Sequence, residues 1–434
     1  MNLKEVLKKV KYQIIKIFGS GSTGSIFKNM SILASGSIIS KLIGFASYPI
    51  ITRIYSPADF GVLAVFSSTI FILLPFSTLR YSFAIPLPKN DILAFNLLST
   101  GFIIAIVLGS LLALFFVISG NFIFNLLNIV EISEYWWLLI LAIMGAALYE
   151  LLTNWASRKL KFGAIAKTGV WRSSISVIIQ IVLGLTGYKS MGLVIGETAH
   201  KMGGGISLLR IFIKDILKNI STLSIKYQFF LLKYYKNFPL FNMPSDLLLV
   251  FTSKVPILYF AYQFGPDYSG QLGLALMIIS VPLQLFGKTA SLAYYAEIAR
   301  IGIREKKQVF AVTKSVLYKL IIFNLFTFII LLFSPSTFSF AFGSKWIQAG
   351  EFTRILSIYL LLEFITTPLT KLFLLYNKQS KYLKTSIYRT GLVISSFYIS
   401  YSLSYDPYQT LSIYTVFMCV HFFLLSYQIY KIIK

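Results

Sequence analysis

Long apolar runs, separated by short polar stretches, dominate the pattern of this chain. A helix that spans a bilayer needs about 20 mostly apolar residues, and runs that do not alternate with period two are helices rather than strands. The pattern predicts about twelve spanning helices, at 29–52, 61–83, 92–119, 136–156, 168–187, 191–213, 238–262, 270–293, 316–340, 351–376, 390–404 and 409–430. The eleventh of these, at 390–404, is the shortest.

The N-terminal segment has a different pattern, in which apolar residues recur at helical spacing and lysines fall off that stripe. Such a stripe favours a basic amphipathic helix on an anionic lipid surface. A frayed basic tail is the alternative interpretation. The apolar stripe consists of Leu3, Val6, Leu7, Val10, Ile14 and Ile17.

Two of the polar breaks resemble each other. "TRIYSPADFGVL" at 52–63 and "AYQFGPDYSGQL" at 261–272 align without a gap when Pro57 is placed on Pro266, which also brings Gly61 onto Gly270. Proline and glycine suit any helical hairpin, but each half of the chain also holds six predicted spans. We therefore predict two like-oriented six-helix bundles around a central cavity, related by a pseudo-two-fold axis along the membrane normal.

The repeat divides the chain into four segments. We predict a cytoplasmic amphipathic helix at 1–28 and an N-terminal bundle at 29–213. A cytoplasmic linker at 214–237 then leads to a C-terminal bundle at 238–434.

Composition supports a membrane protein. Of 434 residues, 56% are hydrophobic and only 13% are charged, whereas soluble domains carry about 25% charged residues. The net charge of +25 is distributed in short clusters between the apolar runs, not along one basic face as nucleic acid requires. Lys and Arg concentrate in the even-numbered connections, which predicts that these connections and both termini are cytoplasmic. The opposite side holds only Arg53, Lys189 and Lys345.

Several kinds of chemistry are excluded by the residues present. A single cysteine, Cys419, permits no internal disulfide, and two histidines, His200 and His421, are too few for a histidine-rich metal centre. "GSGSTGS" at 19–25 lacks the lysine of a phosphate-binding loop. We predict no cofactor, no metal and no enzymatic activity.

Cations inside the spans are the first candidate site residues. A charge at mid-membrane costs about 2.5–3.5 kcal/mol, so it normally faces a cavity or a partner. Lys41 and Lys254 lie too deep to snorkel cheaply, and they occupy nearly equivalent places in the two halves. Arg80 and Lys288 form a second such pair nearer the cytoplasm, although snorkelling explains Arg80 equally well. The predicted anion-binding cations are these four residues and Arg53.

The acids inside the spans are fewer. Glu197 and Lys201 are four residues apart in the order that favours a helical ion pair; ion coupling is the alternative role for Glu197. Asp246, Glu150 and Glu363 lack a local partner, so each either balances a cation across the bundle or binds a coupling H⁺ or Na⁺. The excess of cations favours an anionic substrate, phosphate above all. Four further cations near predicted span ends are interpreted as snorkelling: Arg172, Lys319, Arg354 and Lys371.

The opening region resembles a known family. "TRIYSPADFG" and "LRYSFAIPLPKND", within residues 29–91, are similar to the start of bacterial polysaccharide flippases of the Wzx type. "YKNFPLFNMPSDLL" in the second half also resembles that family. This superfamily includes multidrug-and-toxin extruders and lipid II flippases. The resemblance implies two helical bundles around a cavity that opens alternately to either side.

The resemblance also implies a substrate and a location. Flippases of this type move an undecaprenyl-diphosphate-linked oligosaccharide, such as an O-antigen repeat unit, across the bacterial inner membrane. Arg53 and Arg80 match arginines of the family's opening pattern. Implied partners are membrane lipids, H⁺ or Na⁺, a glycan polymerase and a chain-length regulator. The alternatives are a drug or cation antiporter on the same fold, a membrane glycan polymerase, and a scaffold without transport.

Overall fold

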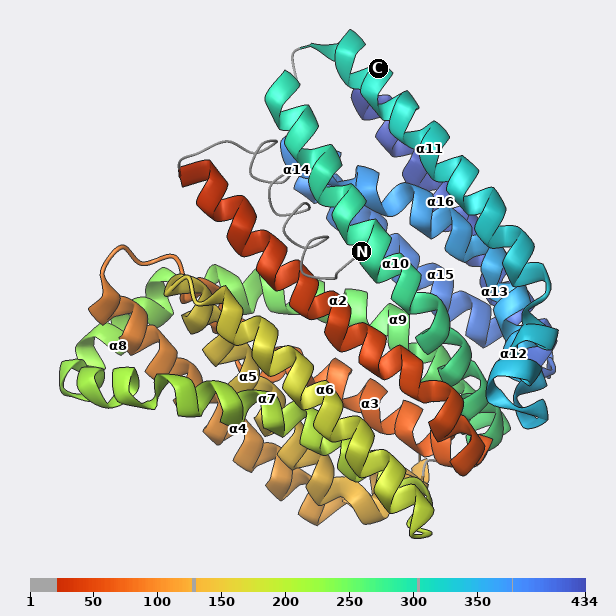
Figure 1. The fold of residues 1–434 in the computed structure, drawn as a ribbon, viewed down its shortest axis with the longest axis horizontal. Coiled ribbons are helices and arrows are strands. Elements are labelled where there is room, and N and C mark those ends of the chain that lie inside the picture. The colour runs from red at the N-terminus through yellow and green to blue at the C-terminus, as the bar shows by residue number, and fades with distance from the viewer. Residues whose placement is uncertain (1–21, 127–129, 303–304, 377) are drawn as a thin grey trace, which may run out of the picture.

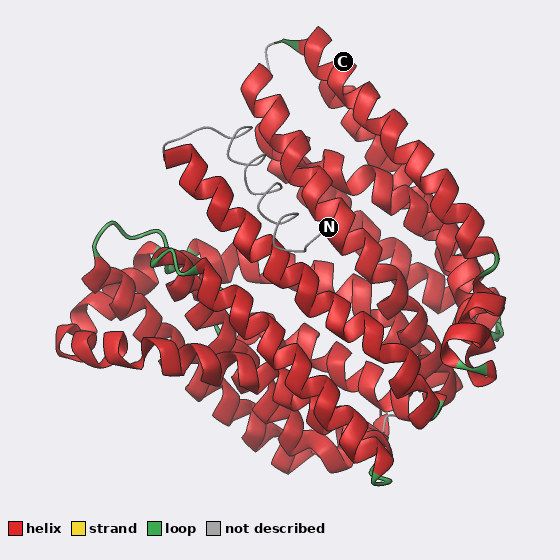
Figure 2. Cartoon of the chain, in the orientation of Figure 1, coloured by secondary structure: helices red, strands yellow, loops and turns green. Residues whose placement is uncertain are grey.

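A computed structural model describes residues 22–126, 130–302, 305–376 and 378–434. Within those ranges every regular element is a helix, and the loops between them are short (Figure 2). The prediction of an all-α fold is confirmed. The predicted amphipathic helix at 1–28 lies mainly outside the described residues, which begin at Ser22.

The helices before residue 225 form what we call the first half, and those after residue 242 form the second half. A short helix, α8 (Ile225–Tyr234), and a π-helical turn (Phe238–Asn242) connect them. The first half contains α2 (Ser22–Ile54), α3 (Pro57–Ser77), α4 (Asp91–Leu126), α5 (Trp136–Arg158), α6 (Phe162–Leu185) and α7 (Lys189–Asn219). The second half contains α9 (Met243–Phe264), α10 (Pro266–Ile301), α11 (Lys306–Leu332), α12 (Ser334–Phe342), α13 (Ile347–Thr366), α14 (Lys371–Leu375), α15 (Gln379–Ser402) and α16 (Pro407–Ile433).

Six helices of each half are long enough to cross a bilayer. In the described part of the chain, α2–α7 have between 21 and 36 residues. The helices α9, α10, α11, α13, α15 and α16 have between 20 and 36 residues. Among the described residues, eight segments are both long enough and apolar enough to be spans. The number of long helices agrees with the prediction, and the chain is a multi-pass membrane protein.

The two halves meet at one end of the molecule. In Figure 1 the red-to-green helices of the first half and the green-to-blue helices of the second half converge where α2 turns into α3. There α3 packs against α10, and α12 contacts α2. Lys345 Nζ donates to the Tyr55 carbonyl at 2.6 Å, and Trp346 Nε1 donates to the Thr52 carbonyl at 3.0 Å. These bonds satisfy carbonyls that the end of α2 leaves unpaired.

The repeated polar breaks are at the centre of this meeting point. Pro57 begins α3 and Pro266 begins α10, as expected for a residue that lacks a donor N–H. Gly61 faces the Pro266 carbonyl, and Gly270 faces the Pro57 carbonyl, each too closely for a Cβ. The contact is reciprocal, as the internal repeat predicts.

Substitution of Gly270 by valine is expected to destabilise the protein. The side chain would collide with the backbone carbonyl of Pro57, which has no rotamer to change. Overpacking of this kind costs about 1–3 kcal/mol. Thermal unfolding of the purified protein should show a lower Tm. Gly391→Ala is the control, because nothing lies within 4 Å of a Cβ there; equal stability of both variants would show that the glycine contact is not closely packed.

Several predicted span boundaries are wrong. The helix predicted at 61–83 ends at Ser77 because Leu79 and Arg80 adopt left-handed backbone angles, with φ of 47° and 59°. The span predicted at 316–340 is two helices, α11 and α12. The span predicted at 390–404 belongs to α15, which begins at Gln379. Backbone hydrogen bonds continue through polar residues, so the edge of an apolar run is not the end of a helix.

Candidate functional site

A cavity of about 840 Å³ lies between the halves and is lined by both. The first half contributes residues of α2, α3, α5, α6 and α7, and the second half residues of α9, α10, α13, α15 and α16. Lys41, Lys254, Glu197 and Glu363 line it, so the structure brings together two predicted cations and two predicted acids. The side chain of Lys288, on α10, is outside the part that the structure describes.

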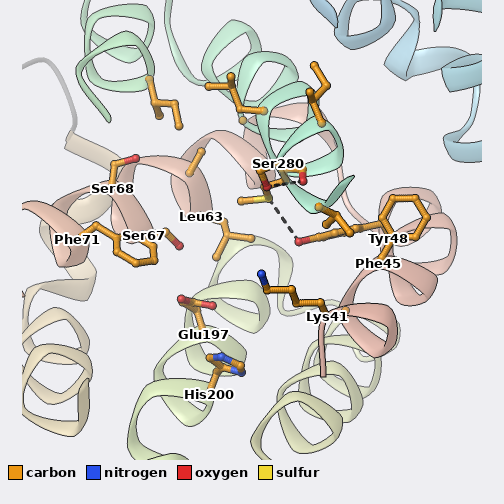
Figure 3. A pocket seen from close by; sticks show the side chains of 18 of the residues that line it. Lys41, Phe45, Tyr48, Leu63, Ser67, Ser68, Phe71, Glu197, His200 and Ser280 are labelled. Atoms are coloured by element: carbon orange, nitrogen blue, oxygen red, sulfur yellow. Dashed lines mark hydrogen bonds between the residues drawn. The ribbon is translucent and has the colours of Figure 1, made fainter. Parts of the chain in front are cut away.

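One cluster of charges lies on the first-half wall. Lys41 on α2 and Glu197 on α7 point into the same space, with His200 one turn further along α7 (Figure 3). Lys201 Nζ is 3.0 Å from Glu197 Oε1, so the predicted ion pair is confirmed. Glu197 neutralises only one of the two lysines, Lys41 and Lys201, so this wall carries a net positive charge.

An aromatic ring brings two lysines from different halves together. The Nζ atoms of Lys201 on α7 and Lys254 on α9 lie 4.4 Å and 4.8 Å from the ring centroid of Phe71 on α3. Cation–π attraction holds ammonium groups at such distances. Glu197 balances only one of these two charges, so the pair keeps a net positive charge that would attract an anion.

Arg172 is a cavity residue that sequence reasoning missed. It lines the cavity, its guanidinium carbon is 4.2 Å from the centroid of the Tyr149 ring, and its buried Nε has no hydrogen-bond partner among the described residues. The interpretation of Arg172 as a snorkelling residue is wrong, because α6 begins at Phe162 and not at residue 168. Small and polar residues at helical spacing on α6 were the available signal: Gly169, Ser173, Ser176 and Gln180 all line the cavity.

Arg389 was also missed. The predicted span started at 390 and left Arg389 in a cytoplasmic connection, whereas α15 carries it into the cavity wall beside Glu363 on α13. With it, the charged residues of the lining, among the side chains that the structure describes, are five cations and two carboxylates. The cations are Lys41, Arg172, Lys201, Lys254 and Arg389; the carboxylates are Glu197 and Glu363.

Arg80 is not part of the cavity lining, which corrects the prediction that it is a cavity cation. The left-handed turn at its backbone directs the guanidinium toward two other predicted residues. Its Nη1 donates to Glu150 Oε2 at 2.7 Å, and its Nε is 3.0 Å from Asp246 Oδ2. Glu150 also accepts from Thr78, at 3.1 Å, and from Ser82. Glu150 and Asp246 thus balance a cation across the bundle, the first of the two interpretations offered for them.

Arg53 does not line the cavity either. It is exposed in the last turn of α2, at the end where the halves meet. Cations at the C-terminus of a helix are favoured by its dipole, which accounts for an arginine at this place.

Comparison with known proteins gives a family and a fold. The sequence profile of the polysaccharide biosynthesis protein family matches residues 50–351. No curated protein sequence matches the chain. Among solved structures, the lipid II flippase MurJ in an inward closed conformation is similar, with a TM-score of 0.70 and 14% identity, over 92% of this chain and 87% of that one.

Two further structures have the same fold at similar identity. An inward-facing multidrug resistance MATE transporter of the MOP superfamily has a TM-score of 0.59 and 15% identity, over 92% of this chain and 94% of that one. A MOP superfamily transporter from Pyrococcus furiosus, described as having a binding pocket of reverse polarity, has a TM-score of 0.60 and 15% identity, over 94% and 96%. The chain belongs to the polysaccharide biosynthesis protein family and has the fold of the MOP superfamily transporters.

Proposed function

We propose that this protein is a flippase that moves an undecaprenyl-diphosphate-linked oligosaccharide from the cytoplasmic to the periplasmic leaflet of the inner membrane. The observation that carries the proposal is the excess of cations in a cavity formed by both halves. Diphosphate is an anion that Lys and Arg bind well through charge-assisted hydrogen bonds. A cavity for cationic drugs would need the opposite balance.

The size of the cavity supports the same substrate. A volume of about 840 Å³ is within the range of pockets that hold small molecules. This volume suits a diphosphate with a few sugars. It is too small to hold a long polyprenyl chain in addition to that head group. The apolar tail gains nothing from leaving the bilayer, so it stays in lipid while the head group crosses.

The two halves supply a mechanism of alternating access. The ammonium groups of Lys41 and Lys254 replace part of the hydration that the diphosphate loses on entering. The close contacts at Gly61 and Gly270 join α3 to α10 at one end of the molecule, and separation of these helices would release the head group there. The coupling ion, H⁺ or Na⁺, would bind at a carboxylate that lines the cavity, Glu197 or Glu363.

The orientation of the chain follows from its charge distribution. Both termini and α8 would face the cytoplasm, because Lys and Arg favour that side. The end where α3 and α10 meet would then face the periplasm. A glycan polymerase and a chain-length regulator would act there on the translocated repeat unit, which could be O-antigen or a related glycan.

Deletion of the gene from its host tests the function. Lipid-linked oligosaccharide should accumulate on the cytoplasmic leaflet, measured by its resistance to an externally added glycosidase in intact spheroplasts. Purified protein in liposomes should make the same glycolipid accessible from the opposite leaflet. Export of cationic drugs by these liposomes, without glycolipid movement, would instead establish the antiporter.

A further inference from the structure

The second-half wall of the cavity has a different chemistry from the first-half wall. Arg389 on α15, Glu363 and Tyr359 on α13, and Tyr414 on α16 line it together. We propose that these four residues form a sugar-binding subsite, separate from the cations that bind the diphosphate. This assignment rests on the proposed function and adds to it where each part of the substrate head is held.

Electrostatic contacts separate the two walls. Arg389 acts on Glu363, Tyr359, Tyr414 and His421, which all belong to α13 and α16. The groups that act on Lys254 lie instead on α7. The cavity therefore holds two charged clusters, one strongly cationic and one with a single cation beside a single carboxylate.

The second cluster has unused hydrogen-bonding capacity. The Nε of Arg389 is buried and has no hydrogen-bond partner among the described residues. No nitrogen of Arg389 comes within ion-pair distance of Glu363 in the part of the chain described. A buried donor without a partner costs about 1–3 kcal/mol, and a ligand that accepts from it would recover that loss.

The combination of groups matches a carbohydrate better than a second phosphate. A sugar hydroxyl is both donor and acceptor, so it can accept from the guanidinium of Arg389 and donate to the carboxylate of Glu363. A phosphate only accepts at its ionised oxygens, and Glu363 would repel it. Phenol groups such as those of Tyr359 and Tyr414 add further donors and acceptors.

Aromatic packing fixes the two phenols in place. The rings of Tyr359 and Tyr414 meet edge to face, with centroids 5.6 Å apart. Tyr359 stacks on Phe422 at 6.3 Å, and Tyr414 stacks on Phe397 at 5.5 Å. Rigid polar groups lose little entropy when they bind, so this wall is preorganised to recognise one arrangement of hydroxyls.

Equilibrium binding to the full-length protein in nanodiscs tests the subsite. The two probes are undecaprenyl diphosphate and the lipid-linked oligosaccharide extracted from producing cells that lack this gene. The wild-type protein should bind the glycolipid more tightly, and the ratio of the two Kd values measures the sugar contribution. Arg389→Gln should reduce that ratio about tenfold and leave the Kd for undecaprenyl diphosphate unchanged.

Three other variants make the test specific. Tyr414→Phe keeps the ring and removes only the hydroxyl, so it should also reduce the ratio if Arg389→Gln does not fold. Lys254→Gln should weaken both probes by the same factor. Lys384→Gln, an exposed position on the same helix as Arg389, is the matched control and should change neither Kd.

The outcomes separate the subsite from the function. Equal weakening of both probes by Arg389→Gln and Tyr414→Phe, or no effect of either, would overturn the sugar subsite while the flippase stands. Equal affinity of the wild-type protein for the two probes would also overturn it. Failure of the wild-type protein to bind either probe would overturn the proposed function itself.

Discussion

Replacement of Lys41 and Lys254 together by alanine is expected to abolish export of the glycan while the protein still inserts in the membrane. Both side chains line the cavity, and they come from different halves. A hydrogen bond to a charged group contributes about 1.5–3 kcal/mol, so loss of both should weaken diphosphate binding by at least about 100-fold. The measurement is surface glycan in cells that carry the variant as their only copy.

The double variant needs a control for the general loss of positive charge. Lys314 and Lys319 are exposed on α11 and do not line the cavity. Their double alanine variant removes the same charge and should export normally. Wild-type export from the Lys41 and Lys254 variant, at equal protein abundance, would refute the assignment of these lysines to the substrate.

Replacement of Arg80 by leucine is expected to cause the largest loss of stability. Arg80 and Glu150 have side chains only 10% and 15% exposed, and Asp246 is 34% exposed. Removal of the guanidinium leaves two carboxylates without their cation, and breaking a buried ion pair costs about 3–5 kcal/mol. Most of that cost should come from Glu150, because water already reaches Asp246. The Tm of the purified protein should fall accordingly.

A neutral version of the same cluster is the control. Arg80→Leu combined with Glu150→Gln and Asp246→Asn removes all three charges, and replacement of a whole buried charge cluster is often nearly neutral. This triple variant should regain most of the lost stability. If Arg80→Leu alone were as stable as the wild-type protein, the cluster would not hold α5 and α9 in place.

The candidate site shows where sequence reasoning succeeds. Lys41 and Lys254 were recognisable because lipid penalises a charge so strongly that depth alone predicts a cavity. Glu197 and Lys201 were recognisable because helical spacing places them together. Both arguments are local: they need only the hydropathy of one segment or the geometry of one helix.

The errors arose where a residue's partner is distant in sequence. Arg80 is in the turn after α3 and Glu150 is on α5, and no spacing rule connects them. Arg172 and Arg389 were misplaced because each lies just outside, or at the end of, an apolar run that the helix extends beyond. Hydropathy identifies the residues that contact lipid. A helix that also faces a polar cavity can be polar along that side, so hydropathy alone misses those residues.

The sequence by itself determined that the chain is helical, spans the membrane many times, and repeats the break at Pro57 and Pro266, because these properties depend on local composition and spacing. Only the tertiary structure decided which charges meet in the cavity and which, such as Arg80, pair elsewhere. That outcome depends on how helices rotate and cross when they pack. Interactions between helices set the rotation, and no single segment encodes it.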